Sequence, residues 1–481
     1  MSILSFIETS LAAFKGCFKR SATYRWFVAV VCGFMVRSDH LGVTSIIRGL
    51  GLHAEQYERL IHFFRSSAYS LEELRKTWYR IIAKSGLLFK VNGRNLILGD
   101  GTKTCKEGRY MPGVKKLYQE SENSAKPQYI FGHMFGGIAV VIGRMRMRFA
   151  CPLSMTIQEG LTCTAAWEGS EHGDATHTIQ IYQNAYDAAR VLGLSYVALD
   201  RLFLTVDSLR ELDRLNSNEH LLDVVTRAKD SCVAHYPLPS DCKPRRGRPR
   251  LKGDSVKLKE LFESRGNDFV KATVTMYGET VNVEYLCLNL QWGNGLYKLL
   301  RFVLVKTPGR GNAIFVATDL NMVPELVIET YANRFKIETM FREFKQQVGG
   351  FCYHFWTKAA PRLNRYKKKG DPNPLETVED SKLRDRILRA LKATESFVLM
   401  SSIAMGLVQM MALTPSMANI ARKSRYLRTK STEHVSEATV MNYLGKNLFS
   451  LLLARPDFPV SQIIRGFQLE YSGFQNDMEA S

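Results

Sequence analysis

Two short apolar runs that end in an acid constrain the fold of this chain most strongly. Leu96–Asp100 and Ser195–Asp200 are mostly aliphatic before the acid and are too short for buried helices, so we predict two buried strands. Reactive groups of α/β sheets usually lie where strands end. Asp100 and Asp200 are therefore candidates for one site, although an Asp after a strand is also common as a turn or helix cap.

The segments around these runs predict a mixed α/β sheet domain. In chain order we expect strands at Leu96–Asp100, at Tyr129–Phe131 with Ile138–Ile142, and at Arg146–Ile157, a helix at His177–Leu192, a strand at Ser195–Asp200, a helix at Leu209–Lys229 and a strand at Ser231–Tyr236. Helical patterning dominates residues 1–90 and Ser381–Leu453 on either side.

A second group of strands is expected after this domain. Pro237–Gly253 is rich in Pro, Gly and Arg, and four strand-like runs follow it. These runs are Ala272–Met276, Val281–Leu290, Leu299–Lys306 and Ile314–Thr318. We interpret the region as a β-rich insertion. A long helix is then predicted from Asn321, with Pro324 in its first turn, to Gly349–Gly350.

One face of that long helix is polar. At about 100° per residue, four side chains fall within roughly 60° of one another; they are Tyr331, Arg334, Glu338 and Lys345. An apolar set projects to the other side and is expected to pack on a sheet; it consists of Ile337, Met340, Phe341 and Phe344. Glu343 points away from the polar face, so Glu338 is the better candidate for a working carboxylate. The alternative is a solvated helix face with weak ion pairs.

Three carboxylates that meet would suit a two-metal site. Magnesium prefers hard oxygen ligands, and two ions about 4 Å apart activate a nucleophile and stabilise the leaving oxygen of a phosphodiester. One Asp bridging both ions, with one further acid for each ion, is sufficient. Asp100, Asp200 and Glu338 supply that set if the fold brings them together.

Charge and cysteine content limit the other functions. The 66 Lys and Arg exceed the 46 Asp and Glu by 20, which favours a polyanionic partner, nucleic acid before an acidic membrane. The apolar stretches Trp26–Met35 and Val398–Leu413 are too short to span a bilayer, so we expect core helices and no membrane partner. The nine cysteines form no Cys-x-x-Cys pair, and His172 and His177 lack the helical spacing of a zinc pair. We expect a reducing compartment.

The helix pattern carries a resemblance. Tyr-x2-Arg-x3-Glu-x6-Lys at Tyr331, Arg334, Glu338 and Lys345 resembles the signature of the DDE transposases of bacterial insertion sequences. Leu-Ile-Leu-Gly-Asp-Gly-Thr around Asp100 and Tyr-Val-Ala-Leu-Asp-Arg-Leu-Phe around Asp200 resemble that family's two acidic strands. The resemblance covers residues 90–350. It departs at Leu202, where many relatives have Gly before the aromatic residue, and Asp207 is the alternative second acid.

The resemblance implies a fold, a reaction and partners. The implied fold class is α/β, with a ribonuclease H-like mixed sheet, a β-rich insertion and helical N- and C-terminal regions. Asp100, Asp200 and Glu338 would be catalytic and hold two magnesium ions, for which manganese can substitute. Tyr331, Arg334 and Lys345 would contact phosphates near the scissile bond. The implied activity is metal-dependent cleavage of transposon ends and strand transfer into target DNA by a cut-and-paste route. The implied partners are double-stranded terminal inverted repeats, target DNA and a second copy of the chain, at the nucleoid in a bacterial cytoplasm.

These inferences divide the chain into six parts. They are a helical DNA-binding region (1–90), the first part of the catalytic core (91–236), the β-rich insertion with a basic arm (237–320), the core helix with Glu338 (321–350), a basic loop and helical C-terminal region (351–470) and a disordered tail (471–481). Within the first part, Val43–Arg65 fits either a helix-turn-helix that reads the terminal repeats or a plain helical bundle.

The basic arm lies inside Lys243–Lys252, where Arg-Gly-Arg-Pro resembles a minor-groove core. Its four arginines are expected to contact DNA, against the alternative of a solvated linker; they are Arg245, Arg246, Arg248 and Arg250. Arg362–Lys369 and Arg422–Lys430 are further basic runs that fit either DNA contacts or solvated loops.

Two other functions remain compatible with the sequence. A ribonuclease H-like endonuclease that cuts without joining would need the same three acids. A catalytically inactive relative that binds the ends and represses transposition would need none of them, and the presence of Asp100, Asp200 and Glu338 argues against it.

Overall fold

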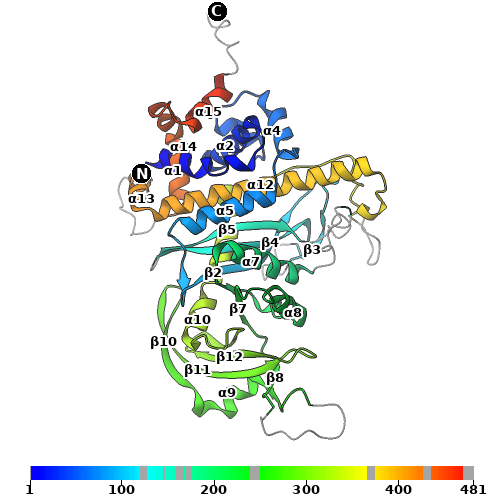
Figure 1. Ribbon diagram of the computed structural model, residues 1–481, viewed down its shortest axis with the longest axis vertical. Helices are drawn as coiled ribbons and strands as arrows, with labels where there is room; N and C mark the ends of the chain where they lie inside the picture. Colours follow the sequence, from blue (N-terminus) through cyan, green and yellow to red (C-terminus); the bar gives the residue numbers. More distant parts are fainter. Residues whose placement is uncertain are drawn as a thin grey trace, which may run out of the picture.

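The computed structural model describes residues 2–119, 127–144, 147–158, 167, 176–238, 250–365, 374–425 and 435–469. A mixed sheet runs through the molecule, with a bundle of N- and C-terminal helices on one side of it (Figure 1). The strands are β1 (Lys90–Val91), β2 (Arg94–Cys105), β3 (Lys115–Tyr118), β4 (Tyr129–Arg144), β5 (Met147–Ile157), β6 (Ser195–Ala198), β7 (Leu222–Arg227), β8 (Val233–His235), β9 (Ser255–Lys257), β10 (Val270–Met276), β11 (Glu279–Trp292), β12 (Lys298–Thr307) and β13 (Gly311–Ala317).

The helices alternate with these strands in the middle of the chain and dominate both ends. They are α1 (Ile3–Ala12), α2 (Ser21–Val36), α3 (Thr44–Gly49), α4 (Gln56–Arg65), α5 (Leu71–Lys84), α7 (His177–Leu192), α8 (Val206–Leu215), α9 (Leu261–Ser264), α10 (Pro324–Ala332), α11 (Phe335–Glu343), α12 (Ser381–Leu413), α13 (Pro415–Arg425), α14 (Glu437–Ala454) and α15 (Pro459–Leu469).

The centre of the sheet has the order β5-β4-β2-β6-β7. β6 is parallel to β2 and to β7, whereas β4 is antiparallel to both β2 and β5. The first five elements of the expected succession are present as β2, β4, β5, α7 and β6. α7 begins and ends where the sequence predicts it, at His177 and Leu192.

The last part of this succession differs from the prediction. The segment expected as one helix, Leu209–Lys229, contains the end of α8 and the whole of β7. The strand expected at Ser231–Tyr236 is β8, which pairs with β9 and β11 and not with the central parallel strands. β7 is buried along most of its length, so its sequence lacks the polar alternation that marks a half-exposed strand.

The strands of the expected insertion continue the central sheet. β7 pairs antiparallel with β13, and the order then runs β12, β11, β8 and β9. Figure 1 shows this part as a curved sheet below the rest of the molecule, with α10 against it. The four predicted strand runs are observed as β10 to β13. The central sheet and the expected insertion therefore share one hydrogen-bonded network.

The predicted long helix is interrupted twice. α10 begins with Pro324 and ends at Ala332, and α11 begins at Phe335 after a turn. A π-helical segment, Phe344–Val348, follows α11 and ends at Gly349, whose φ of 62° is left-handed. Interruptions of this kind are frequent at functional sites.

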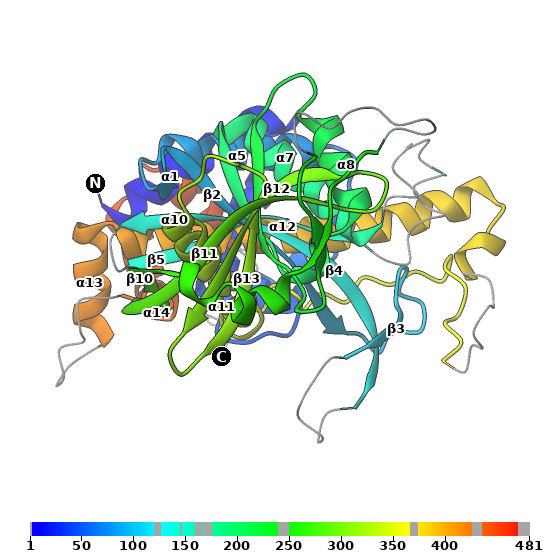
Figure 2. The same ribbon diagram turned by 90° about the horizontal axis from the view of Figure 1, so that it is seen from below.

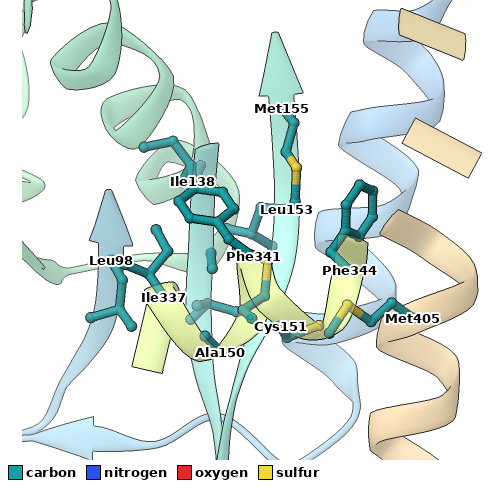
Figure 3. Close-up of a cluster of buried hydrophobic side chains, with 14 of the residues drawn as sticks. Leu98, Ile138, Ala150, Cys151, Leu153, Met155, Ile337, Phe341, Phe344 and Met405 are labelled. Atoms are coloured by element: carbon teal, nitrogen blue, oxygen red, sulfur yellow. The ribbon is translucent and has the colours of Figure 1, made fainter. Parts of the chain in front are cut away.

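The apolar side of α11 packs on the central sheet as expected. Figure 3 shows Ile337, Phe341 and Phe344 beside side chains of β2 and β5. A Cβ at Gly137 of β4 would lie only 2.7 Å from the Phe341 ring, so this glycine permits the close approach. On the opposite face, a Cβ at Gly99 would meet Ile181 of α7. Leu98 and Asp100, two residues apart, therefore face α11.

α12 lies between the sheet and the other N- and C-terminal helices. Figures 1 and 2 show it running across the width of the molecule, and it packs on β5, α2 and α4. It is long and apolar enough to cross a membrane by composition, but 94% of its most apolar window is buried inside the protein. The expectation of a core helix at Val398–Leu413 agrees with this packing.

Candidate catalytic site

Asp100 faces α11 from the middle of β2. The strand continues to Cys105, so Asp100 does not end the strand as the sequence suggested; it pairs with Gly137 of β4. Its Oδ1 accepts a hydrogen bond from the backbone N–H of Gly101 at 2.7 Å. Burial raises the pKa of Asp100 to about 6, and the nearby charges of Asp200 and Glu338 act in the same direction, whereas Arg334 opposes them.

Asp200 lies two residues beyond the end of β6. Asp200 directly precedes a short 3-10 turn, Arg201–Phe203. Its backbone carbonyl accepts a hydrogen bond from the hydroxyl of Thr226 in β7 at 3.0 Å. A cavity of about 330 Å³ opens beside it, lined also by Tyr331, Arg334 and other residues. Leu202, where the sequence departs from the family pattern, is exposed.

Asp207, the alternative second acid, lies elsewhere. It stands in the first turn of α8, largely exposed, and pairs with Arg210 at 3.5 Å. Asp200, by contrast, lines one cavity together with Arg334, which donates a hydrogen bond to Asp100. The geometry favours Asp200 as the partner of Asp100.

Arg334 joins two of the three acids. Its Nη1 lies 3.1 Å from Oδ2 of Asp100, and its Nη2 lies 2.5 Å from Oε1 of Glu338. The three carboxylates of Asp100, Asp200 and Glu338 all favour the charged guanidinium and raise the pKa of Arg334, against the effect of burial. One partly buried cation therefore counters the repulsion within a group of acids.

Tyr331 and Lys345 flank this cluster. Tyr331 is buried with its ring 4.9 Å from that of Phe315, and burial raises its pKa. Nζ of Lys345 donates to the backbone carbonyl of Lys103 at 3.0 Å. Lys345 and Glu338 also line a cavity of about 350 Å³ together with Asp100. The structure thus brings together all six residues that the acidic runs and the helix face indicate.

The donor set suits a divalent cation, but the carboxylates are engaged by Arg334. Asp100, Asp200 and Glu338 offer only oxygen ligands, which magnesium and manganese accept. Within the described ranges, no group of three or more acidic, His or Cys side chains is arranged to hold a metal directly. A metal ion here would compete with Arg334 for Oδ2 of Asp100 and Oε1 of Glu338.

Several residues of the site were not predicted from the sequence. Arg201 and Arg227 line the cavity beside Asp200, and Arg227 was hidden because β7 was predicted as a helix. Tyr277 reaches the same cavity from the tip of the β10–β11 hairpin with a φ of 56°. A bulky residue in the left-handed region is uncommon, and nothing in the sequence alone marks it.

The basic arm falls largely outside the described residues. Arg245, Arg246 and Arg248 belong to that undescribed part, while Arg250 is exposed and lies 3.5 Å from Asp254. The tail 471–481, His172 and most of the two later basic runs also lie outside the described residues. His177 begins α7, where its Nδ1 contacts Oε1 of Gln158.

Burial of Asp100 predicts a pH-dependent stability. Its pKa of about 6 in the folded protein exceeds its ordinary value of 3.8, so its contribution to stability is complete below about pH 4 and is lost as the pH rises through about 6. Relative to wild type, Asp100→Asn should gain on the order of 2 kcal/mol of unfolding free energy between pH 4 and pH 8. Urea denaturation with a chelator present measures the unfolding free energies of both proteins. If their difference were the same at pH 4 and at pH 8, the prediction would be contradicted.

Comparisons with known proteins give a distant structural likeness. No family model matches the chain, and no curated protein matches it. A solved structure described as a piggyBac transposase synaptic complex with hairpin DNA is similar at 12% sequence identity and a TM-score of 0.35, covering 97% of this chain and 82% of that one. A likeness of this degree assigns neither a fold family nor a function.

Proposed function

We propose that this protein is a DDE transposase, which cleaves DNA at transposon ends and joins the freed ends to target DNA. The observation that carries the proposal is the cluster formed by Asp100, Asp200 and Glu338 around Arg334. Residues far apart in the chain, on β2, after β6 and on α11, contribute to it. A mixed sheet in which β6 runs parallel to β2 and β7 supports the ribonuclease H-like fold as part of this proposal.

In this proposal the three carboxylates hold two divalent ions. Bound there, the ions supply charge for the scissile phosphate and for the attacking water or 3′-hydroxyl. Asp100 must be deprotonated to act as a ligand, which its pKa of about 6 allows at neutral pH. Its position in the middle of a buried strand holds the carboxylate rigidly.

Arg334 is proposed to exchange partners when DNA binds. Its planar guanidinium can grip a phosphate with two parallel hydrogen bonds, as it now grips two carboxylates. Leaving Asp100 and Glu338 frees them as ligands. Tyr331 supplies a hydroxyl donor and Lys345 a point charge at the two ends of the same face.

The excess of 20 positive charges supports DNA as the partner. The two proposed DNA partners are the terminal repeats and the target, and joining two ends in concert implies a homodimer on DNA. Cytoplasmic location at a bacterial nucleoid belongs to the same proposal.

A joining assay tests the proposal against its nearest alternatives. Purified protein is incubated with magnesium, a target plasmid and fragments of the DNA that flanks the gene, some already cut to expose 3′-hydroxyls. We expect pre-cut fragments to be joined to the plasmid, because transfer needs only the freed hydroxyl and the metal site. Cleavage without joining would favour the endonuclease, and specific binding of the ends without cleavage would favour the repressor.

A further inference from the structure

A third, larger cavity lies beside α11, away from the Arg334–Glu338 face. Its volume is about 1020 Å³. Its walls come from β5, the β10–β11 hairpin, the α10–α11 junction, α12 and α14. Cavities that enclose a drug-sized ligand measure about 300–1,000 Å³, so this one has room for a flexible ligand of several rings.

Two cations in the wall of this cavity lack acidic partners. Arg148 donates from Nη1 to Asn333 at 3.4 Å, and its guanidinium lies 3.8 Å from the Phe89 ring centroid. Lys336 donates to the backbone carbonyl of Arg148 at 3.3 Å. In the part of the chain that the structure describes, neither side chain forms an ion pair, and Nε of Arg148 is buried with no hydrogen-bond partner.

The surroundings of Arg148 and Lys336 favour the binding of an anion. Burial lowers the pKa of the Arg148 guanidinium, and the charge of Glu329 only partly opposes this. Glu329 is occupied elsewhere, because its carboxylate accepts the backbone N–H of Thr275 at 2.8 Å. A bound anion would relieve the repulsion between the two cations.

The acidic residue that lines this cavity, Glu437, does not form an ion pair with either cation among the described residues. Glu437 is 7% exposed and accepts a hydrogen bond from Nε2 of Gln409 at 3.1 Å. Burial raises its pKa, and the charges that affect it are those of Glu343 and Arg342. Gln409 also leaves its Oε1 buried without a partner among the described residues.

The cavity adjoins the candidate catalytic site. Tyr277 and Phe335 line both it and the cavity beside Asp200. Their rings are 6.3 Å apart at 86°, and both side chains are more than half exposed. A polymer lying beside Asp200 can therefore pass over this aromatic pair into the larger cavity.

We propose that this cavity binds a single-stranded segment of DNA that extends from the scissile phosphate, with its phosphodiesters at Arg148 and Lys336; this inference rests on the proposed function. Proteins that hold single strands combine a cationic groove with exposed aromatic rings. A cavity of this size excludes a duplex. Phosphodiesters supply the anions that the two cations lack.

Binding of defined probes by the full chain tests the proposal without metal or cleavage. The probes are fluorescent oligo-dT of about 15 nucleotides and a blunt duplex, read by anisotropy over a salt series. The double variant R148A/K336A should bind oligo-dT about tenfold more weakly, and its salt slope should fall by roughly 1.4, or 0.7 for each lost phosphate contact. Its affinity for the duplex should stay close to wild type.

Two further variants separate a local effect from misfolding. Thr280 is exposed on the hairpin wall, so Thr280→Glu adds a repelling charge while keeping both cations and should also weaken oligo-dT binding selectively. Arg190→Ala removes an exposed charge from α7 on the opposite face of the sheet and should change neither affinity.

Three results would overturn the inference. The first is wild-type protein that does not bind oligo-dT. The second is an oligo-dT affinity that is unchanged in both R148A/K336A and Thr280→Glu. The third is a loss of duplex binding in these variants that equals their loss of oligo-dT binding. None of them bears on joining activity. Conversely, protein that selects oligo-dT through Arg148 and Lys336 but neither cuts nor joins DNA would refute the proposed function alone.

Discussion

Glu338→Gln is expected to reduce metal-dependent DNA cleavage by at least about 100-fold, since even changes to groups that support a metal ligand cost 10–100-fold. The amide keeps one oxygen, so it can still accept the hydrogen bond from Nη2 of Arg334. It loses the negative charge that a divalent ion requires. The variant should therefore fold and bind DNA normally, and gel assays of cleavage rate and of DNA binding measure the two properties separately.

The same helix provides a matched control. Glu343 follows Glu338 by five residues in α11, pairs with Arg342 at 3.1 Å and does not line the cavity that contains Glu338. Glu343→Gln removes the same charge from the same helix and should leave the cleavage rate near that of wild type. Normal cleavage by Glu338→Gln, or equal losses in both variants, would show that the site is wrongly assigned.

Arg37→Met is expected to lower the free energy of unfolding by about 3 kcal/mol or more, because it leaves several buried acceptors without donors. Arg37 is buried and binds the end of the segment that follows α11. Its Nε lies 3.1 Å from the carbonyl of Val348 and its Nη2 lies 2.8 Å from that of Gly349. Its Nη1 lies 2.9 Å from Oγ of Ser45, and its guanidinium stacks 4.6 Å from the Phe34 ring centroid.

Arg37 is the link between the N-terminal helices and the helix that carries Glu338. Burial lowers its pKa to about 10, so it remains charged at neutral pH and complements the negative end of the helical segment. Arg37→Met should therefore also reduce cleavage in the fraction that stays folded. Chemical denaturation measures the first effect, and the cleavage rate measures the second.

Two controls test whether the geometry of Arg37 matters. Arg37→Lys keeps the charge but loses the planar fork and should recover only part of the stability. Arg48→Ala breaks an exposed pair with Asp39 at 2.8 Å and should cost less than about 1 kcal/mol. If Arg37→Met were as stable as Arg48→Ala, the anchoring role would be wrong.

Local patterns in the sequence were sufficient to predict much of the candidate site. The spacing of Arg334 and Glu338 predicts a shared helix face, and the two side chains are paired in the structure. The opposite apolar face, including Ile337 and Phe341, packs on the sheet as predicted. Helical period is a local property, so short interruptions before α11 and after it do not displace neighbours three or four residues apart.

Other features had no local signal. β2 continues through Gly101–Cys105, a mostly polar run that is a strand because β4 pairs with it. β7 was predicted as helix because a strand buried on both faces lacks alternation. With β7 misassigned, Arg227 could not be recognised as a neighbour of Asp200. Pairing between strands depends on segments far apart in the chain, so no window of sequence contains it.

The sequence by itself determined which side chains can act: Asp100, Asp200 and Glu338 as oxygen ligands, Arg334 and Lys345 as cations, and a net charge that favours DNA. Only the tertiary structure decided that Arg334 occupies the acids, that Arg37 holds the end of their helix, and that two cations without acidic partners line a cavity nearby. Residue type and helical period are encoded locally, whereas burial, pairing and counter-ions depend on which distant segments the packed core brings into contact.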